Sequence, residues 1–423
     1  MMNKSLLLLA ALPATLPAVA AEPAKSTDWA DEVKKALVVY ENKDTFINKV
    51  NFTIRQQWQM ASVQPNGSNG LHLKDGATPF NSEFRRSWLG LNVNMSSGTQ
   101  FNIIGRVGGL PSRSTYTSTG RTKRNFTYTD IYSVWVKQNI PAVKGLSVKA
   151  GKFAPNFTLD YRISNANITC VERSYICNQF GMDSNWGVEL NYTSPDKKNI
   201  LFLELMANDR ASASKNMGHR DVYRDGRGLK GEFGWEDKCF LILGGTHKFD
   251  VTENGYQAIS AEYMHDFNNA YHSRRNPGAN NYGLGFKDAL SIGYEMKQDK
   301  LTFQANVVAA FEQQTGHGTN NIGLQLQPIY AIHPQVDLVF RYTGMTGDGA
   351  CKLGGDRYIC NQTYADSWVD SLHAFYFGVD LYASAKHKDA AKLMFGAEYT
   401  TARKDGSDCY NGWEFTTALR FNF

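Results

Sequence analysis

The chain has 423 residues, a formal net charge of +5 at pH 7 and an aromatic content of 13%. So small a charge excess over so long a chain argues against nucleic acid as a partner. After residue 21 the sequence has no run of about 18 apolar residues, which excludes membrane-spanning helices. An exported β-sandwich and a transmembrane β-barrel both fit this composition.

The first 21 residues have the features of a secretory signal peptide. Lys4 precedes an apolar run over 6–12, and small residues at 18–21 provide a cleavage site after Ala20 or Ala21. The chain is therefore expected to be exported, and removal of residues 1–21 lowers its net charge to +4.

A short amphipathic helix is predicted after the signal peptide, within a periplasmic lead-in over residues 22–47. Apolar residues recur at helical spacing through 27–42, and Thr27 or Asp28 can cap the first turn. The apolar positions are Trp29, Val33, Leu37 and Tyr40. Such a helix could plug a lumen or contact a partner, but packing against the base of the following domain is the simpler interpretation.

From residue 48 to the C-terminus at 423, the apolar residues recur with a period of two. In 301–311, apolar side chains at odd positions alternate with Thr302, Gln304 and Asn306. Segment 412–423 alternates in the same way and ends on Phe423, which resembles the C-terminal assembly signal of outer-membrane barrels. Strands of about ten residues with this alternation predict an all-β fold, a transmembrane antiparallel β-barrel.

The barrel is expected to have about 16 strands, with 18 as the alternative. Counting every alternating segment gives seventeen if 256–267 is a strand, and an even number is needed when both termini lie in the periplasm. We therefore assign 256–267 to a long outer loop. Short turns alternate with long loops along the chain. The long loops are predicted at 64–83, 111–127, 158–184, 210–227, 312–320, 345–367 and 403–411.

One long loop follows a clear strand and then continues without any period. Leu146, Val148 and Ala150 alternate with polar residues, and the alternation stops at Ala154. Long ordered excursions of this kind are usually functional. We expect residues 158–184 to fold into the lumen and to form a constriction of the pore.

Two segments carry motifs that point to a known family. Gly151, Phe153, Phe157 and the Glu-Arg-Ser triplet at 172–174 form the first, and the double arginine of EFRRSWLGLNV (83–93) forms the second. With these motifs the chain resembles the phosphate-selective porin O/P family of Gram-negative outer membranes. The resemblance implies an outer-membrane homotrimer of sixteen-stranded barrels that passes phosphate.

Basic side chains on the polar strand faces and in the loop are candidates for an anion-binding constriction. Lysine and arginine attract oxyanions and donate hydrogen bonds as the ion loses water. The predicted pore-lining residues are Arg55, Arg85, Arg86, Arg106, Lys149, Lys152, Arg162, Arg173 and Arg341. Adjacent residues of a regular strand face opposite sides, so only one of Arg85 and Arg86 is expected to line the pore unless both lie near its rim.

The alternative explanation is that these arginines only form ion pairs across the lumen. Candidate wall partners are Glu295, Glu312, Asp337 and Glu398. The loop acids Asp160, Glu172 and Asp183 oppose strict anion selectivity, and Asn156 interrupts the family's Pro-Phe pair, which weakens the case for phosphate specificity. Glu172 is expected to hold the loop to the wall by pairing with an arginine.

Six cysteines in an exported chain predict disulfides. Cys170 with Cys177, and Cys351 with Cys360, are close in sequence and lie in predicted loops, so both pairings are plausible. Cys239 and Cys409 would lie at opposite ends of the wall, and their state is left open.

The motifs HExxH, GxSxG and the P-loop are absent from the sequence, so we expect no enzyme and no cofactor or metal. We predict a porin for passive diffusion of small polar or anionic solutes such as phosphate, surrounded by outer-membrane lipid. Basic outer segments at 120–125, 219–227 and 272–278 could funnel anions or bind acidic surface polysaccharide. The alternative function is a surface adhesin or structural barrel without an open pore.

Overall fold

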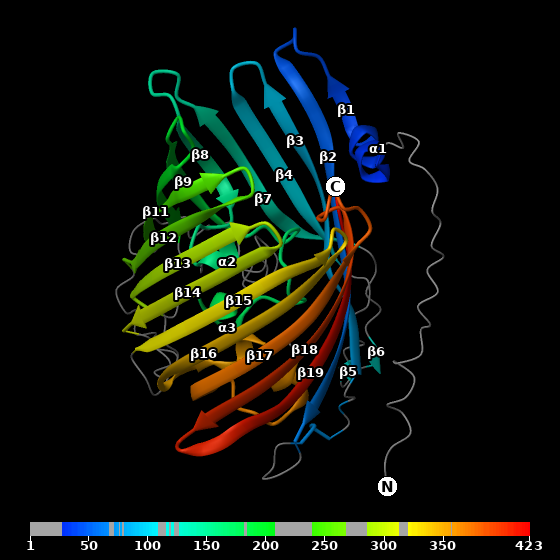
Figure 1. The fold of residues 1–423 in the computed structure, drawn as a ribbon, viewed down its shortest axis with the longest axis vertical. Helices are drawn as coiled ribbons and strands as arrows, with labels where there is room; N and C mark the ends of the chain where they lie inside the picture. The colour runs from blue at the N-terminus through cyan, green and yellow to red at the C-terminus, as the bar shows by residue number, and fades with distance from the viewer. Residues whose placement is uncertain are drawn as a thin grey trace.

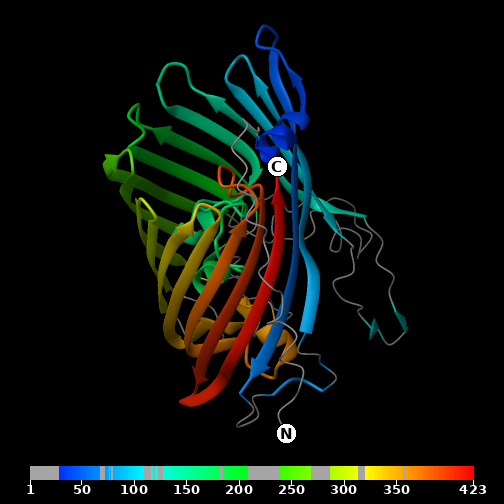
Figure 2. The same ribbon diagram turned by 45° about the vertical axis from the view of Figure 1, so that its right-hand side comes forward.

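The protein forms one closed antiparallel β-barrel, seen here in a computed structural model (Figure 1, Figure 2). In the residues that the structure describes, seventeen strands make one sheet, of which sixteen close into a ring and β1 pairs with β2 in addition. The described residues are 28–66, 72–75, 77, 80–108, 116–117, 120–121, 127–181, 184–207, 239–267, 286–312, 320–356 and 358–423. The predicted signal peptide lies outside them.

Strands that follow one another along the chain lie side by side in the wall. The wall strands are β2 (Ile47–Pro65), β3 (Phe80–Met95), β4 (Thr99–Gly108), β7 (Thr127–Asn139), β8 (Leu146–Phe153), β9 (Asn185–Thr193), β10 (Asn199–Ala207), β11 (Cys239–Thr252), β12 (Gly255–Asp266), β13 (Asp288–Gln298), β14 (Leu301–Phe311), β15 (Asn321–His333), β16 (Val336–Lys352), β17 (Trp368–Tyr382), β18 (Ala391–Lys404) and β19 (Ser407–Asn422). The remaining elements are α1 (Trp29–Ala36), β1 (Val38–Glu41), β5 (Tyr116–Thr117), β6 (Gly120–Arg121), α2 (Leu159–Arg162), α3 (Tyr175–Phe180), η2 (Leu353–Gly355) and α5 (Ile359–Gln362).

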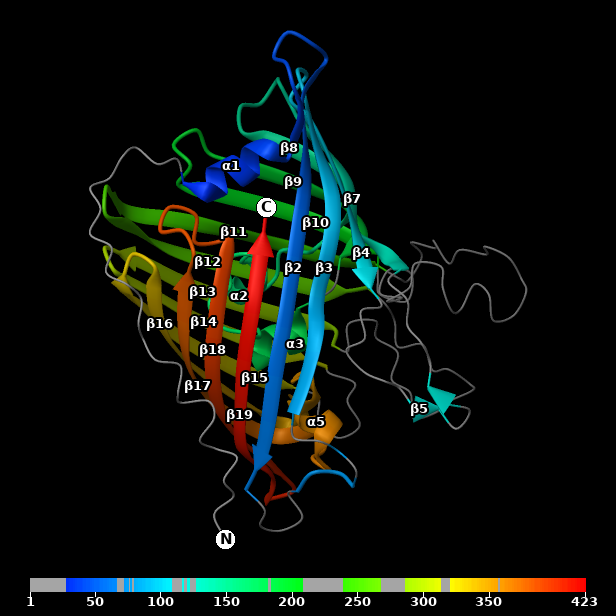
Figure 3. The same cartoon turned by 90° about the vertical axis from the view of Figure 1, so that its right-hand side faces the viewer.

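The ring closes where the last strand meets the first wall strand. β19 pairs with β2 from Asn422 opposite Arg55 to Gly412 opposite Pro65. Figure 3 shows the two strands side by side, with the C-terminus at the end where α1 lies. The prediction of a sixteen-stranded barrel is confirmed.

The assignment of 256–267 to an outer loop is wrong, because this segment is strand β12. It pairs along its length with β11 on one side and β13 on the other. Its alternation is that of a wall strand, with Ser260 and Glu262 buried and Ile259 and Tyr263 exposed. β10 pairs directly with β11. The predicted loop at 210–227 lies outside the described residues.

The alternation of side chains gives the wall an apolar outside and a polar inside. In β14, Gln304 and Asn306 are buried on the inner face, whereas Val307 and Phe311 are 39% and 45% exposed on the outer face. A lipid-facing surface requires this arrangement, since lipid cannot satisfy polar groups. None of the helices in the described part of the chain has the length and apolarity needed to cross a membrane.

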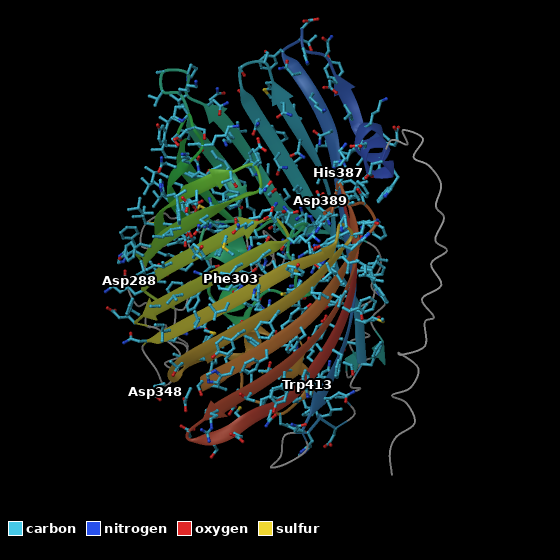
Figure 4. The ribbon with its side chains drawn as sticks, viewed as in Figure 1. Asp288, Phe303, Asp348, His387, Asp389 and Trp413 are labelled. Atoms are coloured by element: carbon cyan, nitrogen blue, oxygen red, sulfur yellow. The ribbon has the colours of Figure 1, made fainter. Side chains whose placement is uncertain are left out.

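The N-terminal helix α1 docks at the end of the barrel that carries the C-terminus. Asp28 caps it by accepting a hydrogen bond from the Ala30 backbone N–H at 2.9 Å. The Trp29 ring lies 5.8 Å from that of Phe423, and Asp31 contacts His387 at 2.7 Å. Figure 4 shows His387 near α1. The helix is shorter than the predicted 27–42, because residues 38–41 pair with β2 as β1.

Two predicted loops are shorter than expected. Segment 403–411 is a tight hairpin in which β18 ends at Lys404 and β19 begins at Ser407. Gly406 adopts a φ of +75°, which suits a two-residue turn. In the predicted loop 345–367, β16 continues to Lys352, so the loop proper begins with η2.

The structure contains none of the predicted disulfides, and all six cysteines are free thiols. The predicted pairs were Cys170 with Cys177 and Cys351 with Cys360. In the first pair, the Cys170 thiol approaches the side chain of Gln327 on β15 at 3.5 Å, while Cys177 lies within α3. In the second pair, one thiol faces the Asp370 carbonyl on β17 at 3.5 Å. Proximity in sequence therefore did not predict disulfide pairing, because the two thiols of each pair contact other groups instead of each other.

Candidate pore constriction

Residues 154–181, here called the inner loop, lie inside the barrel between β8 and β9. Its two short helices, α2 and α3, are seen within the ring of strands in Figure 1 and Figure 3. The inner loop contacts the inner face of distant strands: the Leu159 N–H donates to Asn306 on β14, and the Val171 N–H donates to Tyr376 on β17. The segment therefore divides the lumen, as a constriction must.

Gly151 allows the chain to turn toward the lumen at the end of β8. Its φ of +131° is a conformation that side chains rarely adopt, and a Cβ there would lie 2.2 Å from the Val134 carbonyl oxygen. Thr158 and Ser174 then cap α2 and α3 by accepting hydrogen bonds from backbone N–H groups. The backbone conformation at this position therefore explains why the motif has a glycine there.

Arg173 holds the inner loop in shape from within. Its guanidinium donates to the Ile163 carbonyl at 2.6 Å and to the Asn165 side chain at 2.9 Å, and it pairs with Asp160 at 3.4 Å. Asp160 in turn accepts hydrogen bonds from the backbone and the hydroxyl of Ser174. Arg173 is only 8% exposed, so the structure gives this predicted pore residue a scaffolding position.

Three cations of the wall hold the inner loop by its backbone carbonyls. Arg341 on β16 donates to the Glu172 carbonyl at 2.8 Å, and Arg420 on β19 donates to the Val171 carbonyl at 2.5 Å. Lys392 on β18 donates to the Ile168 carbonyl at 2.5 Å. Arg341 also pairs with Glu398 at 2.7 Å, which fixes its guanidinium in the wall.

A β-bulge in β3 turns both arginines of the double-arginine motif inward. Gln57 lies opposite Arg86 and Trp58 lies opposite Phe84, so Arg85 is the extra residue of the bulge. Arg85 Nε donates to the Glu172 carboxylate at 2.8 Å, and Arg86 donates to Gln57 Oε1 at 2.6 Å. The expectation that only one of the pair faces the lumen assumed a regular strand, and the bulge overturns it.

Two further arginines are held by a stack of aromatic rings on the neighbouring strands. The rings of Trp88 and Tyr132 stack at 3.9 Å. Arg55 lies over the outer face of Trp88 at 4.9 Å, and Arg106 lies over Tyr132 at 4.9 Å. Each such cation–π contact contributes about 0.5–2 kcal/mol, and it orients a guanidinium without neutralising it.

Four arginines of the wall and Arg173 of the inner loop lie around one carboxylate, that of Glu172. We call this set the arginine cluster; it comprises Arg85, Arg86, Arg173, Arg341 and Arg420. Burial alone would raise the pKa of Glu172, but the charges of Arg85 and Arg86 outweigh burial and lower it below its ordinary value. Glu172 is therefore ionised at neutral pH and attaches the inner loop to the wall, as its charge predicted.

The other predicted residues lie against a different part of the wall. Lys149 pairs with Glu189 of β9 at 2.8 Å, and Arg162 of α2 pairs with Glu262 of β12 at 3.3 Å. Lys152 is buried and donates to the backbone carbonyl of residue 131. The sequence-predicted set is thus divided between two sides of the lumen.

A cavity of about 560 Å³ lies between the inner loop and strands β12–β16. Charged groups of both signs line it. The cations are Lys297, Lys300, Arg341 and Lys388, and the acids are Asp160, Glu172, Glu295, Asp299 and Asp337. A small oxyanion fits such a volume, and Glu172 and Arg341 are among the residues that line it.

Apolar side chains fill the lumen on the other side of the inner loop, toward the ends of the strands joined by long loops. Phe157, Ile176 and Phe180 of the inner loop pack there with Leu353 and Ile359 of the segment after β16. Wall residues that complete this apolar cluster include Phe202, Phe240, Met264 and Met345. The cluster narrows the passage and makes the inner loop part of a hydrophobic core.

Sequence reasoning missed Gln59, Lys392 and Arg420 as parts of the site. Arg420 lies on the polar face of the last strand, so the alternation alone could have selected it. Gln59, which donates to the Glu172 carboxylate at 2.8 Å, carries no charge and gives no comparable signal. Among the predicted acids, Glu398 pairs with Arg341, whereas Glu312 is exposed at the strand end beside Lys287.

Comparisons with known proteins agree with this geometry. The model of the family described as phosphate-selective porin O and P matches residues 51–223, which include both arginines of the bulge and the whole inner loop. The predicted resemblance to the porin O/P family is confirmed. No curated protein sequence matches the chain.

Solved structures of outer-membrane channels share the fold. The DcaP channel of Acinetobacter baumannii has a TM-score of 0.52 and 13% identity, covering 91% of this chain and 99% of its own. OmpF of Salmonella typhi has a TM-score of 0.54 and 8% identity, covering 91% and 100%. The anion-selective porin of Comamonas acidovorans has a TM-score of 0.52 and 11% identity, covering 88% and 99%. At such low identity the likeness shows the fold. The chain thus has the fold of outer-membrane porins, a closed antiparallel β-barrel.

Proposed function

We propose that this porin lets small hydrophilic solutes diffuse across the outer membrane and that its constriction prefers anions such as phosphate. The observation that carries the proposal is the arginine cluster around Glu172. Arg86 donates to a neutral amide and Arg420 donates only to backbone carbonyls within the described residues, so their charges are not cancelled by direct ion pairs.

Such a site favours anions without trapping them. A guanidinium that already holds a neutral acceptor can exchange it for an oxyanion, and each exchanged contact contributes about 1.5–3 kcal/mol at most. Several weak contacts in sequence let an ion enter and leave. The acids that line the 560 Å³ cavity limit the preference, so we expect a moderate anion selectivity.

Phosphate is the narrower part of the proposal. Its support is the match to the phosphate-selective porin family and the fold neighbour described as an anion-selective porin. Arginine suits phosphate because its fork of N–H donors matches two oxygens of the ion. We treat the chain as a channel rather than an enzyme, since the matched family is one of porins.

The test is single-channel recording in planar bilayers across a KCl gradient, followed by titration with inorganic phosphate. A reversal potential that favours chloride, with block by phosphate, is the expected result. A potential near zero or favouring potassium, without block, would leave a general porin and remove the anion preference.

A second candidate function, a surface adhesin or structural barrel without an open pore, draws on the apolar cluster. Buried residues such as Phe157, Phe180 and Leu353 occupy lumen that an open channel would fill with water. The same recordings decide, because a closed barrel gives no regular conductance steps.

The homotrimer and the contact with surface polysaccharide stay predictions. The trimer rests on the family resemblance, and chemical cross-linking in native outer membranes tests it. The basic segments at 219–227 and 272–278, proposed to meet polysaccharide, lie outside the described residues, as does most of 120–125.

A further inference from the structure

We propose that the carboxylate of Glu172 occupies an oxyanion-binding site of the constriction and that a permeating oxyanion binds there by displacing it. The inner loop would then carry a built-in competitor that weakens the site. This inference rests on the proposed function, because it concerns the same arginine cluster.

The donors around Glu172 are those expected of an oxyanion site. One carboxylate oxygen, Oε1, accepts from Arg85 Nε at 2.8 Å and from Gln59 Nε2 at 2.8 Å. Both donors belong to the wall, on β3 and β2, so they do not depend on the loop for their place. Glu172 also acts electrostatically on Arg86 and Arg420. A carboxylate or phosphate oxygen in the place of Oε1 would meet the same charges and donors.

The site can be reached from solution. Glu172 and Arg341 line the 560 Å³ cavity, and the Glu172 side chain retains 13% exposure. A solute in this cavity approaches the carboxylate without crossing the apolar cluster on the other side of the inner loop.

The side chain of Glu172 can move while the backbone of the loop stays in place. Arg341 holds the Glu172 carbonyl, Arg420 holds the Val171 carbonyl, and Tyr376 holds the Val171 N–H. Ser174 is fixed separately by Asp160. Displacement therefore needs only rotation of one side chain, which costs far less than opening the loop.

The ligand class is a small oxyanion, phosphate or carboxylate. Both present oxygens that accept from a guanidinium and an amide at once. Competition with a tethered carboxylate keeps the affinity low, which a diffusion channel requires for release.

The experiment compares the full-length wild-type porin with Glu172→Gln in planar bilayers, using inorganic phosphate and then acetate as blocking probes. Glutamine keeps the size and one oxygen acceptor but removes the competing charge. We expect the half-blocking phosphate concentration to fall about tenfold, because one charge-assisted contact no longer competes. Acetate should show a shift in the same direction, since carboxylates share the site.

Glu295→Gln is the matched control, because Glu295 lines the same cavity but contacts the neutral Tyr256 and Gln304 instead of arginines. Glu295→Gln should change the half-blocking phosphate concentration by less than about twofold. Should Glu172→Gln fail to form a barrel, Glu172→Asp retains the charge but shortens its reach, and block should strengthen about threefold.

The outcomes separate this inference from the proposed function. Wild-type block by phosphate with no gain in Glu172→Gln overturns the inference and leaves the anion preference standing. Block that is present in Glu172→Gln and absent from wild type supports the inference. Absence of block in both proteins overturns the inference together with the phosphate preference. An equal gain in Glu295→Gln overturns the inference alone.

Discussion

Two sides of the lumen use the same residue types and differ in what the cations contact. On the side of β2, β3 and β16–β19, Arg86 donates to an amide, Arg420 donates to backbone carbonyls and Arg55 lies over an aromatic face. Arg85 and Arg341 on this side also pair with carboxylates. On the side of β8–β12, two cations form ion pairs with carboxylates: Lys149 pairs with Glu189 and Arg162 with Glu262. Glu204 adds a further acid there, opposite Glu189 and linked to it through Asn156.

The comparison shows that the partner, more than the number of cations, decides whether a wall attracts anions. A cation that is paired at 3 Å with a carboxylate presents little net charge to a passing ion. An arginine held by neutral acceptors is equally well ordered but keeps its field. We therefore expect selectivity to come from the arginine cluster, with the opposite side serving to seat the inner loop.

The largest effect should follow from removing both charges of the bulge. Arg85→Gln combined with Arg86→Gln takes away two charges of the cluster, of which that of Arg86 meets a neutral amide, and it leaves Glu172 without its ion pair. At an intermediate effective dielectric this should reduce the chloride-to-potassium permeability ratio by about tenfold or more. The measurement is the reversal potential across a KCl gradient.

The matched control for that variant is Lys149→Gln with Glu189→Gln, which removes one complete ion pair from the opposite side and leaves the net charge there unchanged. The permeability ratio should therefore change little. An equal change in the two double variants would show that any loss of charged side chains from the lumen, rather than the charge of the arginine cluster, alters selectivity.

A somewhat smaller effect is expected from the anchor Arg420, which is 1% exposed. Arg420→Met leaves the Val171 carbonyl without its donor, at a cost of about 1–3 kcal/mol, and loosens the inner loop locally. Hydrogen exchange of residues 168–174 should become faster and single-channel noise should rise. Arg403→Met, at an exposed position on β18, is the control and should change neither.

The fold was predictable because a period of two persists through every wall strand, as the segment 301–311 shows. The position of the inner loop also follows from sequence, since the alternation stops where Gly151 turns the chain inward. The assignment of Arg85 and Arg86 was not predictable, because a bulge of one residue changes the face of a side chain and leaves no mark in a period-two pattern. The predicted disulfides failed because closeness in sequence does not fix the partner of a thiol: Cys170 meets Gln327 on β15, and Cys351 meets the Asp370 carbonyl on β17.

The pH dependence of thermal stability tests whether the loop after β16, which packs in the apolar cluster, contributes to the stability of the barrel. Burial raises the pKa of Asp356 to about 6, although two backbone N–H groups near Tyr358 oppose the shift. A carboxyl whose pKa is higher in the folded state binds more protons there, so stability falls as pH rises from about 4 to 6 and is flat above that. Thermal unfolding should therefore shift to higher temperature as pH is lowered from 8 to 5.

Asp356→Asn removes this titration and supplies the comparison for the pH series. The variant should lose the part of the pH dependence that lies between about 4 and 6, and its melting temperature at pH 8 should not fall below that of wild type. An unchanged pH profile in Asp356→Asn would assign the dependence to another group and separate the loop from any pH response.

The smallest effect concerns the aromatic stack, which orients arginines without changing charge. Trp88→Leu removes the ring between Arg55 and Tyr132 and so loses about 0.5–1 kcal/mol of cation–π attraction. The reversal potential should stay nearly unchanged, while the half-blocking phosphate concentration rises about two- to fivefold because Arg55 is less well placed. Trp413→Leu is the control, because Trp413 is an exposed residue of β19 that lies well away from His387 and α1 in Figure 4. This variant should leave block by phosphate unchanged. Trp88→Leu could instead shift the reversal potential as much as Arg85→Gln combined with Arg86→Gln does. The orientation of the guanidinium groups would then matter as much as their charge, and the two sides of the lumen would differ in geometry as well as in electrostatics.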